Sequence, residues 1–270
     1  MIFDTHCHGY WHGLEHRQDE VLRNMRAEGV TRSIQIGTGL EKSLRALALA
    51  RDWGPGAWCS AGIHPTGCQD MDPSSVPGWM TQFEELIRAN RDKMVAVGET
   101  GLDYFHVARG KEAAQKNTQQ LFFAAQAELA LRLDLPLVIH TRDAAADTAA
   151  LLKRHGVRRA VIHSFSENPA FARELLEWSD GIYFSFSGIL TYKRSAAVQE
   201  TARLLPLNRI LVETDAPFLV PQALRDKFRV NEPAFTRHIM DFLKSMRSEP
   251  AEAVEQTVWE NSHAFFNIPQ

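Results

Sequence analysis

Two histidines separated by one residue stand near the start of the chain, in the segment Asp4–His8 (DTHCH). In an extended strand the side chains alternate between two faces, so His6 and His8 point to one side and Cys7 to the other. Neutral imidazole is a good ligand for zinc and other first-row metals. Taken alone, the pair is a weak signal, because histidines on the surface or hydrogen-bonded in a core are more common than metal ligands.

Four other apolar runs along the chain also end at a side chain that can bind a metal. Only 11 of the 270 residues are histidine, and a role in the core gives no reason for several runs to finish in this way. Six nitrogen or oxygen ligands would serve two divalent cations if one carboxylate bridged them. Glu99 is the predicted bridge because it lies between the other strands. The predicted metal ligands are His6, His8, Glu99, His140, His163 and Asp215.

The elements that must position these residues are short β-branched runs alternating with amphipathic segments, a pattern typical of parallel strands joined by helices. Eight strands in 270 residues predict a single-domain α/β fold, a (β/α)₈ TIM barrel spanning residues 1–270, with its active site at the carboxyl ends of the strands. An open doubly wound sheet is the alternative, because strand count alone does not prove closure. The predicted strands are 2–5, 33–37, 58–62, 94–98, 137–140, 160–163, 182–185 and 210–213. The predicted helices are 19–28, 41–52, 79–90, 111–133, 144–155, 169–178, 196–204, 234–246 and 250–265, with a loop at 216–233.

The composition narrows the class of protein. Hydrophobic residues make up 44% of the chain and charged residues 23%, which is ordinary for a globular protein. The net charge of -3 excludes binding of nucleic acid by bulk positive charge, so any polyanion must be held by a local basic region. Three cysteines without metal-finger spacing favour a reducing compartment, and we expect the cytoplasm. We expect no signal peptide and no membrane segment, and nothing indicates an obligate protein partner.

Six segments in this order resemble the motifs of the TatD family of metal-dependent hydrolases, within the amidohydrolase superfamily. The match spans nearly the whole chain, and the order and strand positions agree together. The resemblance implies a barrel with two divalent cations (magnesium, manganese or zinc) that hydrolyses phosphodiesters, often as a deoxyribonuclease with exonuclease character. Some members of the family act on other esters, including mischarged aminoacyl-tRNA. The segments are Asp4–His8, Gly62–Pro65 (GIHP), Gly98–Tyr104 (GETGLDY), Ile139–Ala144 (IHTRDA), His163–Ser166 (HSFS) and Glu213–Leu219 (ETDAPFL).

Carried over residue by residue, the resemblance assigns a role to each predicted ligand. His6, His8 and Asp215 would hold one cation, His140 and His163 the other, and Glu99 would bridge them. Asp215 would also act as the general base toward the attacking water.

Three further residues are candidates beside the ligands. His64 resembles a family position near the scissile group, where it would donate to a phosphate oxygen or orient water; alternatively, it fixes the loop before Pro65. Asp4 and Glu213 alternate onto the ligand-bearing strands and would orient imidazoles from behind, although Asp4 is equally suited to a buried hydrogen-bond anchor.

Basic and aromatic residues fall in loops on the predicted catalytic face, a combination that suits single-stranded nucleic acid. The alternative is that each is an ordinary surface or loop-packing residue. Two departures from the family pattern bear on substrate access and specificity: Glu167 stands where many relatives have glycine, and residues 222–230 are hard to match. The predicted substrate-binding residues are His64, Arg142, Arg225, Lys227 and Arg229, with Lys193, Tyr104, Phe105, Tyr192 and Phe228 as further candidates.

The sequence therefore predicts a metal-dependent phosphodiesterase, a deoxyribonuclease acting on single strands or ends, with Asp215, Glu99 and His64 as catalytic residues. One rival is an ester or amide hydrolase on the same scaffold, such as an aminoacyl-tRNA deacylase, because a fold does not choose its reaction. The other is a metal-binding protein without catalytic activity.

Overall fold

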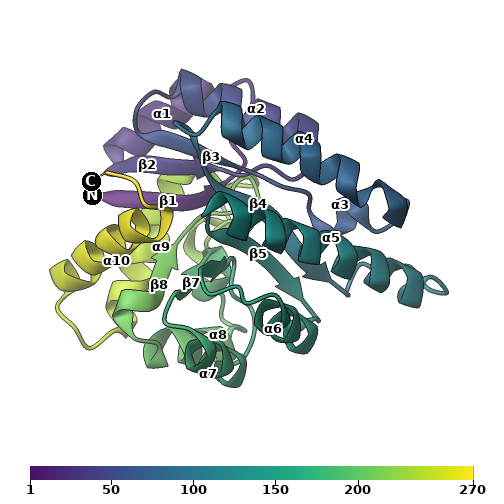
Figure 1. Ribbon diagram of the computed structural model, residues 1–270. Coiled ribbons are helices and arrows are strands. Elements are labelled where there is room, and N and C mark those ends of the chain that lie inside the picture. Colours follow the sequence, from purple (N-terminus) through teal and green to yellow (C-terminus); the bar gives the residue numbers. More distant parts are fainter. Residues whose placement is uncertain (270) are drawn as a thin grey trace.

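Eight parallel strands follow one another in chain order around one sheet in the computed structural model, which describes residues 1–269 (Figure 1). This order confirms the predicted single-domain (β/α)₈ barrel and excludes the doubly wound sheet, in which the strand order reverses. The strands are β1 (Ile2–Cys7), β2 (Val30–Gln35), β3 (Ala57–Ala61), β4 (Met94–Asp103), β5 (Leu137–Arg142), β6 (Ala160–Ile162), β7 (Ile182–Phe186) and β8 (Ile210–Val212).

Helices follow the strands and cover the outside of the sheet (Figure 1). Each predicted strand and helix is present, with ends that differ by a few residues. The largest difference is β4, which was predicted to end with its apolar run at Gly98 and instead stays paired with β5 as far as Asp103. The helices are α1 (Gln18–Ala27), α2 (Leu40–Asp52), α3 (Pro65–Cys68), α4 (Val76–Ala89), α5 (Glu112–Leu133), α6 (Ala145–Arg154), α7 (Pro169–Trp178), α8 (Ala196–Leu204), α9 (Thr236–Met246) and α10 (Ala251–Phe266).

Short turns of 3₁₀ helix supplement these elements. Four of them and the four-residue helix α3 lie in connections where the sequence predicted no helix, one of them inside the predicted loop 216–233, whereas the fifth overlaps the start of the predicted helix 234–246. The turns are η1 (Pro73–Ser75), η2 (Gly188–Thr191), η3 (Leu207–Arg209), η4 (Gln222–Leu224) and η5 (Pro233–Phe235).

The barrel closes between β1 and the segment that follows β8. Cys7 and Ala216 form a parallel bridge, and Asp215 N–H donates to the His6 carbonyl at 2.9 Å. The fully buried Asp4 carboxylate reinforces this seam, since it accepts from both the N–H (2.9 Å) and the hydroxyl (2.6 Å) of Thr214. Closure therefore depends on a few contacts at the mouth of the barrel rather than on a long ladder of backbone bonds.

Two apolar layers fill the molecule, one inside the barrel and one between the sheet and its helices. Because side chains alternate along a strand, the residue two positions after an inward apolar side chain also faces inward. Val138, Val161 and Leu211 belong to the inner layer. Two positions further along these strands stand His140, His163 and Glu213. These three side chains thus lie directly above the apolar core of the barrel.

Polar side chains on the inner face of α5 hold the ends of two strands. Gln126 accepts from the Ile63 N–H (2.8 Å) and donates to Thr100 Oγ1 (2.7 Å). Gln119 accepts from the N–H of Asp103 (2.8 Å) and donates to its carbonyl (2.9 Å). These bonds fix the segments that leave β3 and β4.

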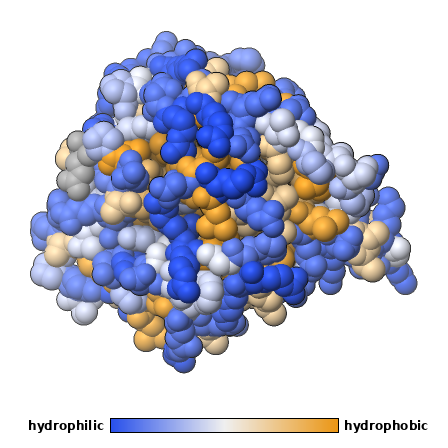
Figure 2. Space-filling model, in the orientation of Figure 1, coloured by the Kyte–Doolittle hydropathy of each residue, from blue (hydrophilic) through white to orange (hydrophobic). Residues whose placement is uncertain are grey.

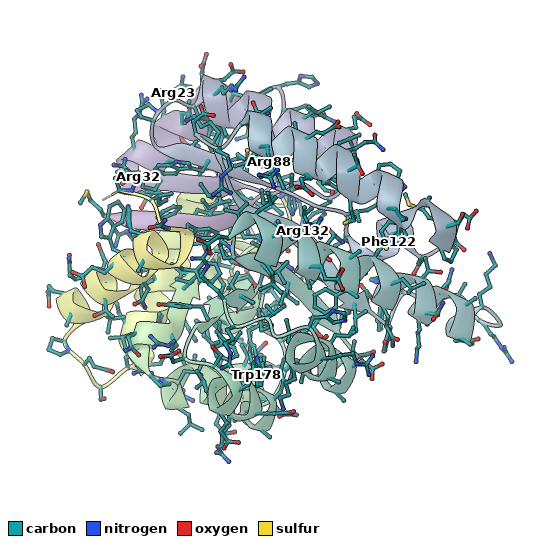
Figure 3. The ribbon with its side chains drawn as sticks, viewed as in Figure 1. Arg23, Arg32, Arg88, Phe122, Arg132 and Trp178 are labelled. Carbon is teal, nitrogen blue, oxygen red and sulfur yellow. The ribbon has the colours of Figure 1, made fainter. Side chains whose placement is uncertain are left out.

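The outer surface is mostly hydrophilic in the view of Figure 2, with smaller apolar patches. Figure 3 shows why: Phe122 is buried beneath α5, while Arg88 and Arg132 lie on the outer faces of α4 and α5, where both contact Glu84. The amino group of Met1 contacts Glu255 at 3.0 Å, so the start of the chain lies against α10 (Figure 1). Within residues 1–269, no helix is long and apolar enough to cross a membrane.

We expect Asp4→Ala to destabilise the protein by about 2–4 kcal/mol, because it leaves two buried donors of Thr214 without an acceptor. Urea denaturation measures this change. Burial raises the pKa of Asp4 to about 8 despite the hydrogen bonds from Thr214 that lower it, so the neutral Asp4→Asn variant should lose much less. Asp70→Ala, at an exposed acid, is the control. Wild-type stability in Asp4→Ala would show that the seam is held by other contacts.

Candidate metal centre

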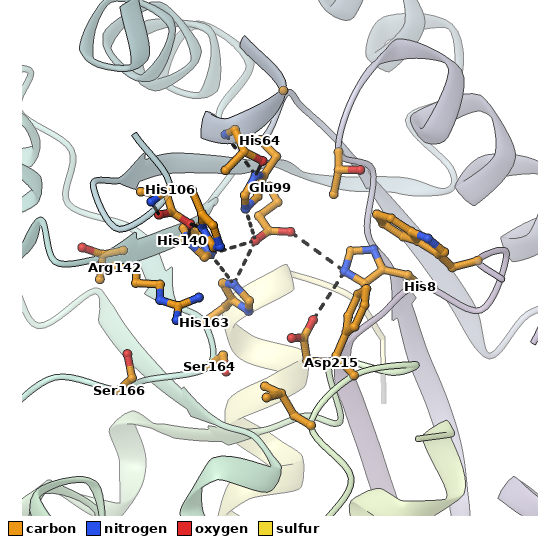
Figure 4. Close-up of a pocket in the computed structure, with 18 of the residues that line it drawn as sticks. His8, His64, Glu99, His106, His140, Arg142, His163, Ser164, Ser166 and Asp215 are labelled. Carbon is orange, nitrogen blue, oxygen red and sulfur yellow. Dashed lines mark hydrogen bonds and ion pairs between the residues drawn. The ribbon is translucent and has the colours of Figure 1, made fainter. Parts of the chain in front are cut away.

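Five of the six residues predicted as metal ligands line one pocket of about 680 Å³ at the carboxyl ends of the strands (Figure 4). The sixth, His6, lies beside them, with its Nε2 3.3 Å from Nε2 of His8. Four of the six are buried, whereas His140 and Asp215 are half-buried. Three overlapping groups of potential ligand atoms lie within 4.8 Å of one another: His6, His8 and Asp215; His6, Glu99 and His163; and His64, Glu99 and His140.

Glu99 stands between two sets of imidazoles. Its Oε1 lies 2.9 Å from His163 Nε2 and 3.3 Å from His140 Nδ1. Its Oε2 lies 3.6 Å from His6 Nε2 and 3.9 Å from His8 Nε2. One carboxylate therefore faces both predicted cation positions, each with a different oxygen.

Two glycines permit the close approach of β4 to its neighbours. A Cβ at Gly101 would lie 2.0 Å from the carbonyl oxygen of His140, and the residue has φ +128°, a conformation that favours glycine. A Cβ at Gly62 on the neighbouring strand end would lie 2.6 Å from the Gly98 backbone. The strands that carry Glu99 and His140 could not come so near with larger residues at these positions.

The second set joins β1 to the end of β8. His8 Nδ1 lies 3.0 Å from the Ile36 carbonyl, which can only accept, so Nδ1 carries the hydrogen and Nε2 of the neutral ring offers a lone pair. That Nε2 lies 3.3 Å from His6 Nε2 and 3.4 Å from Asp215 Oδ1. Cys7 points away into the outer layer and contacts Gln35, as strand alternation predicts.

The same reasoning fixes the rings of His140 and His163. His163 Nδ1 donates to Glu213 Oε1 (3.2 Å), which also accepts from the Ser164 N–H at 2.6 Å. His140 Nε2 donates to Asp103 Oδ2 (3.1 Å). Each ring thus turns its other nitrogen toward Glu99. Imidazoles that bind metals usually hold their second nitrogen in this way.

The electrostatics of the pocket fit a cation at its centre. Burial by itself raises the pKa of Glu99, but the charge of His163 and hydrogen bonds from His140 and His163 outweigh it and lower the pKa well below its usual range. Burial likewise lowers the pKa of His163, yet Glu99 and Glu213 raise it well above the ordinary value. A buried carboxylate in this pocket therefore needs positive charge within hydrogen-bond distance to remain ionised. Lone pairs of nitrogen and oxygen that converge at this spacing are a donor set that divalent cations satisfy.

His64 differs from the other histidines of the pocket. Its Nδ1 accepts from the N–H of Thr66 (3.2 Å) and lies 2.7 Å from the Thr66 hydroxyl, so the hydrogen of the neutral ring is on Nε2. Nε2 lies 3.4 Å from Glu99 Oε1. Burial lowers the pKa of His64 to about 3, which keeps the ring neutral. His64 therefore caps the short helix α3, which is its predicted structural role, and it also presents an N–H to the pocket.

The two residues predicted to orient imidazoles have different contacts. Glu213 holds the ring of His163 as described. Asp4 bonds to Thr214 and the backbone of β1 and to no imidazole nitrogen within the described residues, so it has the alternative role of a buried anchor.

The structure brings only some of the predicted substrate-binding residues to the pocket. Arg142 lines it and lies over the ring of Phe105, 3.8 Å from the ring centroid. Glu167 is not among the residues that line the pocket; Ser164 and Ser166 line it beside His163. Arg225, Lys227 and Arg229 are exposed on the segment after β8, outside the pocket lining; Lys193 and the aromatic residues Tyr104, Phe105, Tyr192 and Phe228 are also outside that lining.

Sequence reasoning missed several residues of the pocket wall. Trp11 and Phe218 pack edge to face (5.5 Å) beside His8, and the Lys42 ammonium lies 4.2 Å from the Trp11 ring. Asp103 and His106 also line the pocket. Alternation from Glu99 through position 101 would have placed Asp103 inward, had β4 been extended. No sequence signal singled out Trp11 or Lys42.

Comparisons with known proteins agree with the architecture. The sequence model of the family described as TatD related DNase matches residues 3–267. The metal-dependent hydrolase YcfH of Escherichia coli, itself uncharacterized, is 34% identical, over 99% of this chain and 96% of its own. The 3′-5′ ssDNA/RNA exonuclease TatD of Cronobacter sakazakii is 33% identical, over 94% of this chain and 93% of its own.

A solved structure extends the likeness to three dimensions. The crystal structure of YjjV, a TatD homologue from Escherichia coli, superposes with a TM-score of 0.88 at 29% identity and covers 99% of this chain and 98% of that one. A family match over almost the entire length, together with the barrel and its cluster of histidines and carboxylates, shows that the chain belongs to the TatD family of metal-dependent hydrolases, in the amidohydrolase superfamily.

Proposed function

We propose that this TatD-family hydrolase is a phosphodiesterase that acts on nucleic acid, as a deoxyribonuclease on single strands or ends, with two divalent cations. The observation that carries the proposal is the orientation of the donors around Glu99. His8, His140 and His163 each have one ring nitrogen held by a carbonyl or a carboxylate, and each turns the other toward the centre. Such a set would hold one cation at His6, His8 and Asp215 and the other at His140 and His163.

Cations held by these residues would lower the pKa of a bound water toward neutrality and would offset the charge that builds on phosphate oxygens. The chain's own residues do the rest. Asp215, at the mouth of the pocket, takes the proton of the attacking water. The Nε2–H of His64 donates to a phosphate oxygen beside Glu99, and Glu99 keeps the two sets of imidazoles at a fixed separation.

Three features support a nucleic-acid substrate. The Cronobacter sakazakii relative is an exonuclease on single-stranded DNA and RNA. The pocket has an aromatic wall, Trp11 and Phe218, on which a base can stack. Arg142 and Lys42 provide positive charge at the pocket, although the whole chain has a net charge of -3.

The alternative is an ester or amide hydrolase such as an aminoacyl-tRNA deacylase, since the relative YcfH is named only as a metal-dependent hydrolase. A panel of purified protein loaded with magnesium, manganese or zinc decides between them. Turnover of phosphodiesters and oligonucleotides supports the proposal. Turnover of aminoacyl esters alone supports the alternative, and tight metal binding with no turnover of any ester would indicate a metal-binding protein.

Removing metal with a chelator should abolish turnover reversibly and leave the fold intact, because the strands and the inner apolar layer do not need the ions. Circular dichroism should change little, and activity should return when metal is added. Cooperative unfolding on chelation would contradict this separation of core and site.

Glu99→Gln and Asp215→Asn should each lower the rate roughly 100- to 10,000-fold, because they remove the bridging charge and the proton acceptor. His64→Gln should remain within roughly tenfold, since its amide N–H can replace Nε2–H. Steady-state rates with elemental analysis of metal content measure these effects. A near-normal rate in Glu99→Gln with two metals bound would contradict the assigned bridge.

We also propose that Arg225, Lys227 and Arg229 contact the backbone of a longer substrate, since they are exposed on the segment that continues from the pocket-lining residues Phe218 and Leu219. Reversing their charge should raise KM for an oligonucleotide, and each lost phosphate contact should reduce the salt slope by roughly 0.7 for a single strand. Hydrolysis of a small chromogenic phosphodiester should change little. Equal damage to both substrates would mean that the segment shapes the pocket itself, and no damage would leave these residues as ordinary surface charges.

A further inference from the structure

One carboxylate oxygen in the pocket holds two imidazoles. Asp103 Oδ2 lies 3.1 Å from Nε2 of His140, a proposed metal ligand, and 2.8 Å from Nδ1 of His106. A charged carboxylate can only accept hydrogen bonds, so Nε2 of His140 and Nδ1 of His106 each carry a hydrogen. The bond to His140 is enough to hold that ring in place. The bond to His106 therefore needs another explanation.

The His106 ring has a fixed orientation. Asp103 is buried, and its backbone N–H and carbonyl are both bonded to Gln119 of α5. Its Oδ1 accepts from the backbone N–H of His106 at 3.0 Å, while Oδ2 accepts from the ring. The edge of the ring also packs against Phe105, 4.9 Å between centroids. The main chain and the ring of His106 are thus held at once by a single buried side chain.

The free nitrogen of this ring is available to a substrate. Because Nδ1–H is hydrogen-bonded to Asp103, Nε2 of His106 is the atom that can exchange a proton with a substrate or with water. His106 lines the same pocket as the proposed metal ligands and is 49% exposed. It lies beyond His140, on the Oε1 side of Glu99, whereas Asp215 lies with His6 and His8 on the Oε2 side (Figure 4).

We propose that His106 is the general acid that protonates the leaving oxygen, a role that rests on the proposed phosphodiesterase function for its substrate. In an in-line displacement the attacking water and the leaving group stand on opposite sides of phosphorus. The water oxygen forms the new bond to phosphorus while Asp215 takes its proton. The bond from phosphorus to the leaving oxygen breaks, and that oxygen takes the proton from His106 Nε2. Solvent then returns a proton to His106 and removes one from Asp215.

Two substrates that share thymidine 5′-phosphate test this role. In dithymidine monophosphate the leaving group is a sugar hydroxyl, which must be protonated; in thymidine 5′-(4-nitrophenyl phosphate) it is nitrophenolate, which leaves without a proton. We expect His106→Asn to lower kcat for the dinucleotide roughly 100- to 10,000-fold and to change kcat for the nitrophenyl ester only a few-fold. Equal losses for both substrates, or no loss for either, would overturn the proposal.

Matched variants separate proton transfer from simpler roles. In His106→Asn the new amide can still donate to Asp103, so metal content and melting temperature should stay at wild-type values; loss of metal would mean that His106 serves only to hold the site. His106→Gln can return an N–H near Nε2 but cannot transfer its proton, so rescue of the dinucleotide rate by glutamine would also overturn the proposal. His155→Asn is the control, since His155 pairs with Glu128 at 3.3 Å outside the pocket lining.

A failure of the proposed phosphodiesterase function can be distinguished from a failure of the proposed role of His106. If the wild-type protein cleaves carboxylic esters and no phosphodiester, the phosphodiesterase assignment is wrong, and the same comparison is made with an alkyl and a nitrophenyl ester of one acid. His106→Asn should then lose only the alkyl ester, and a loss that does not depend on the leaving group would overturn the role of His106.

Discussion

The structure depends on keeping buried carboxylates and several imidazole lone pairs within hydrogen-bond distance of one another. The two oxygens of Glu99 face imidazoles from three other strands, His163 and His140 on one oxygen and His6 on the other. Three of the imidazoles in the pocket are held by a hydrogen bond to the ring nitrogen that points away from its centre. Glu213, Asp103 and the Ile36 carbonyl accept these bonds from His163, His140 and His8. The outer contacts therefore determine which nitrogen faces a cation.

The barrel supplies the rigidity that this arrangement needs. Its apolar interior lies two residues below His140 and His163, so packing of the core fixes the height of these two donors above it. Closure matters as much as packing, because His6 and His8 come from the first strand and Asp215 from the segment after the last. The buried bond between Asp4 and Thr214 lies across that seam, which links a stability element directly to one half of the site.

The pocket is not symmetrical about Glu99. One side has Trp11 and Phe218 packed near His8, an apolar surface with the Lys42 ammonium over it. The other side has Arg142, Ser164 and the Asp103–His106 pair, all polar. A substrate that places a flat apolar group on one side and charged or hydroxyl groups on the other fits both surfaces. Because the two sides of the pocket differ, a polymer with two distinct ends would bind in one orientation.

The sequence by itself determined the alternation of eight strands with helices and the ligand types that follow the apolar runs, because both are local properties of each segment. It placed His6 and His8 on one face and His140 and His163 at strand ends, and the structure has them there. What it could not provide was the length of β4, since pairing with β5 rather than local composition carries that strand to Asp103. It likewise could not show that Gln119 and Gln126 on α5 bond to strand ends, or that Asp4 bonds to Thr214 rather than to a histidine. Nor could it separate Arg142, at the pocket, from Arg225, Lys227 and Arg229 outside its lining. Those contacts join residues far apart in the chain, and only the closed barrel, which brings first and last strands together, decides which partners meet.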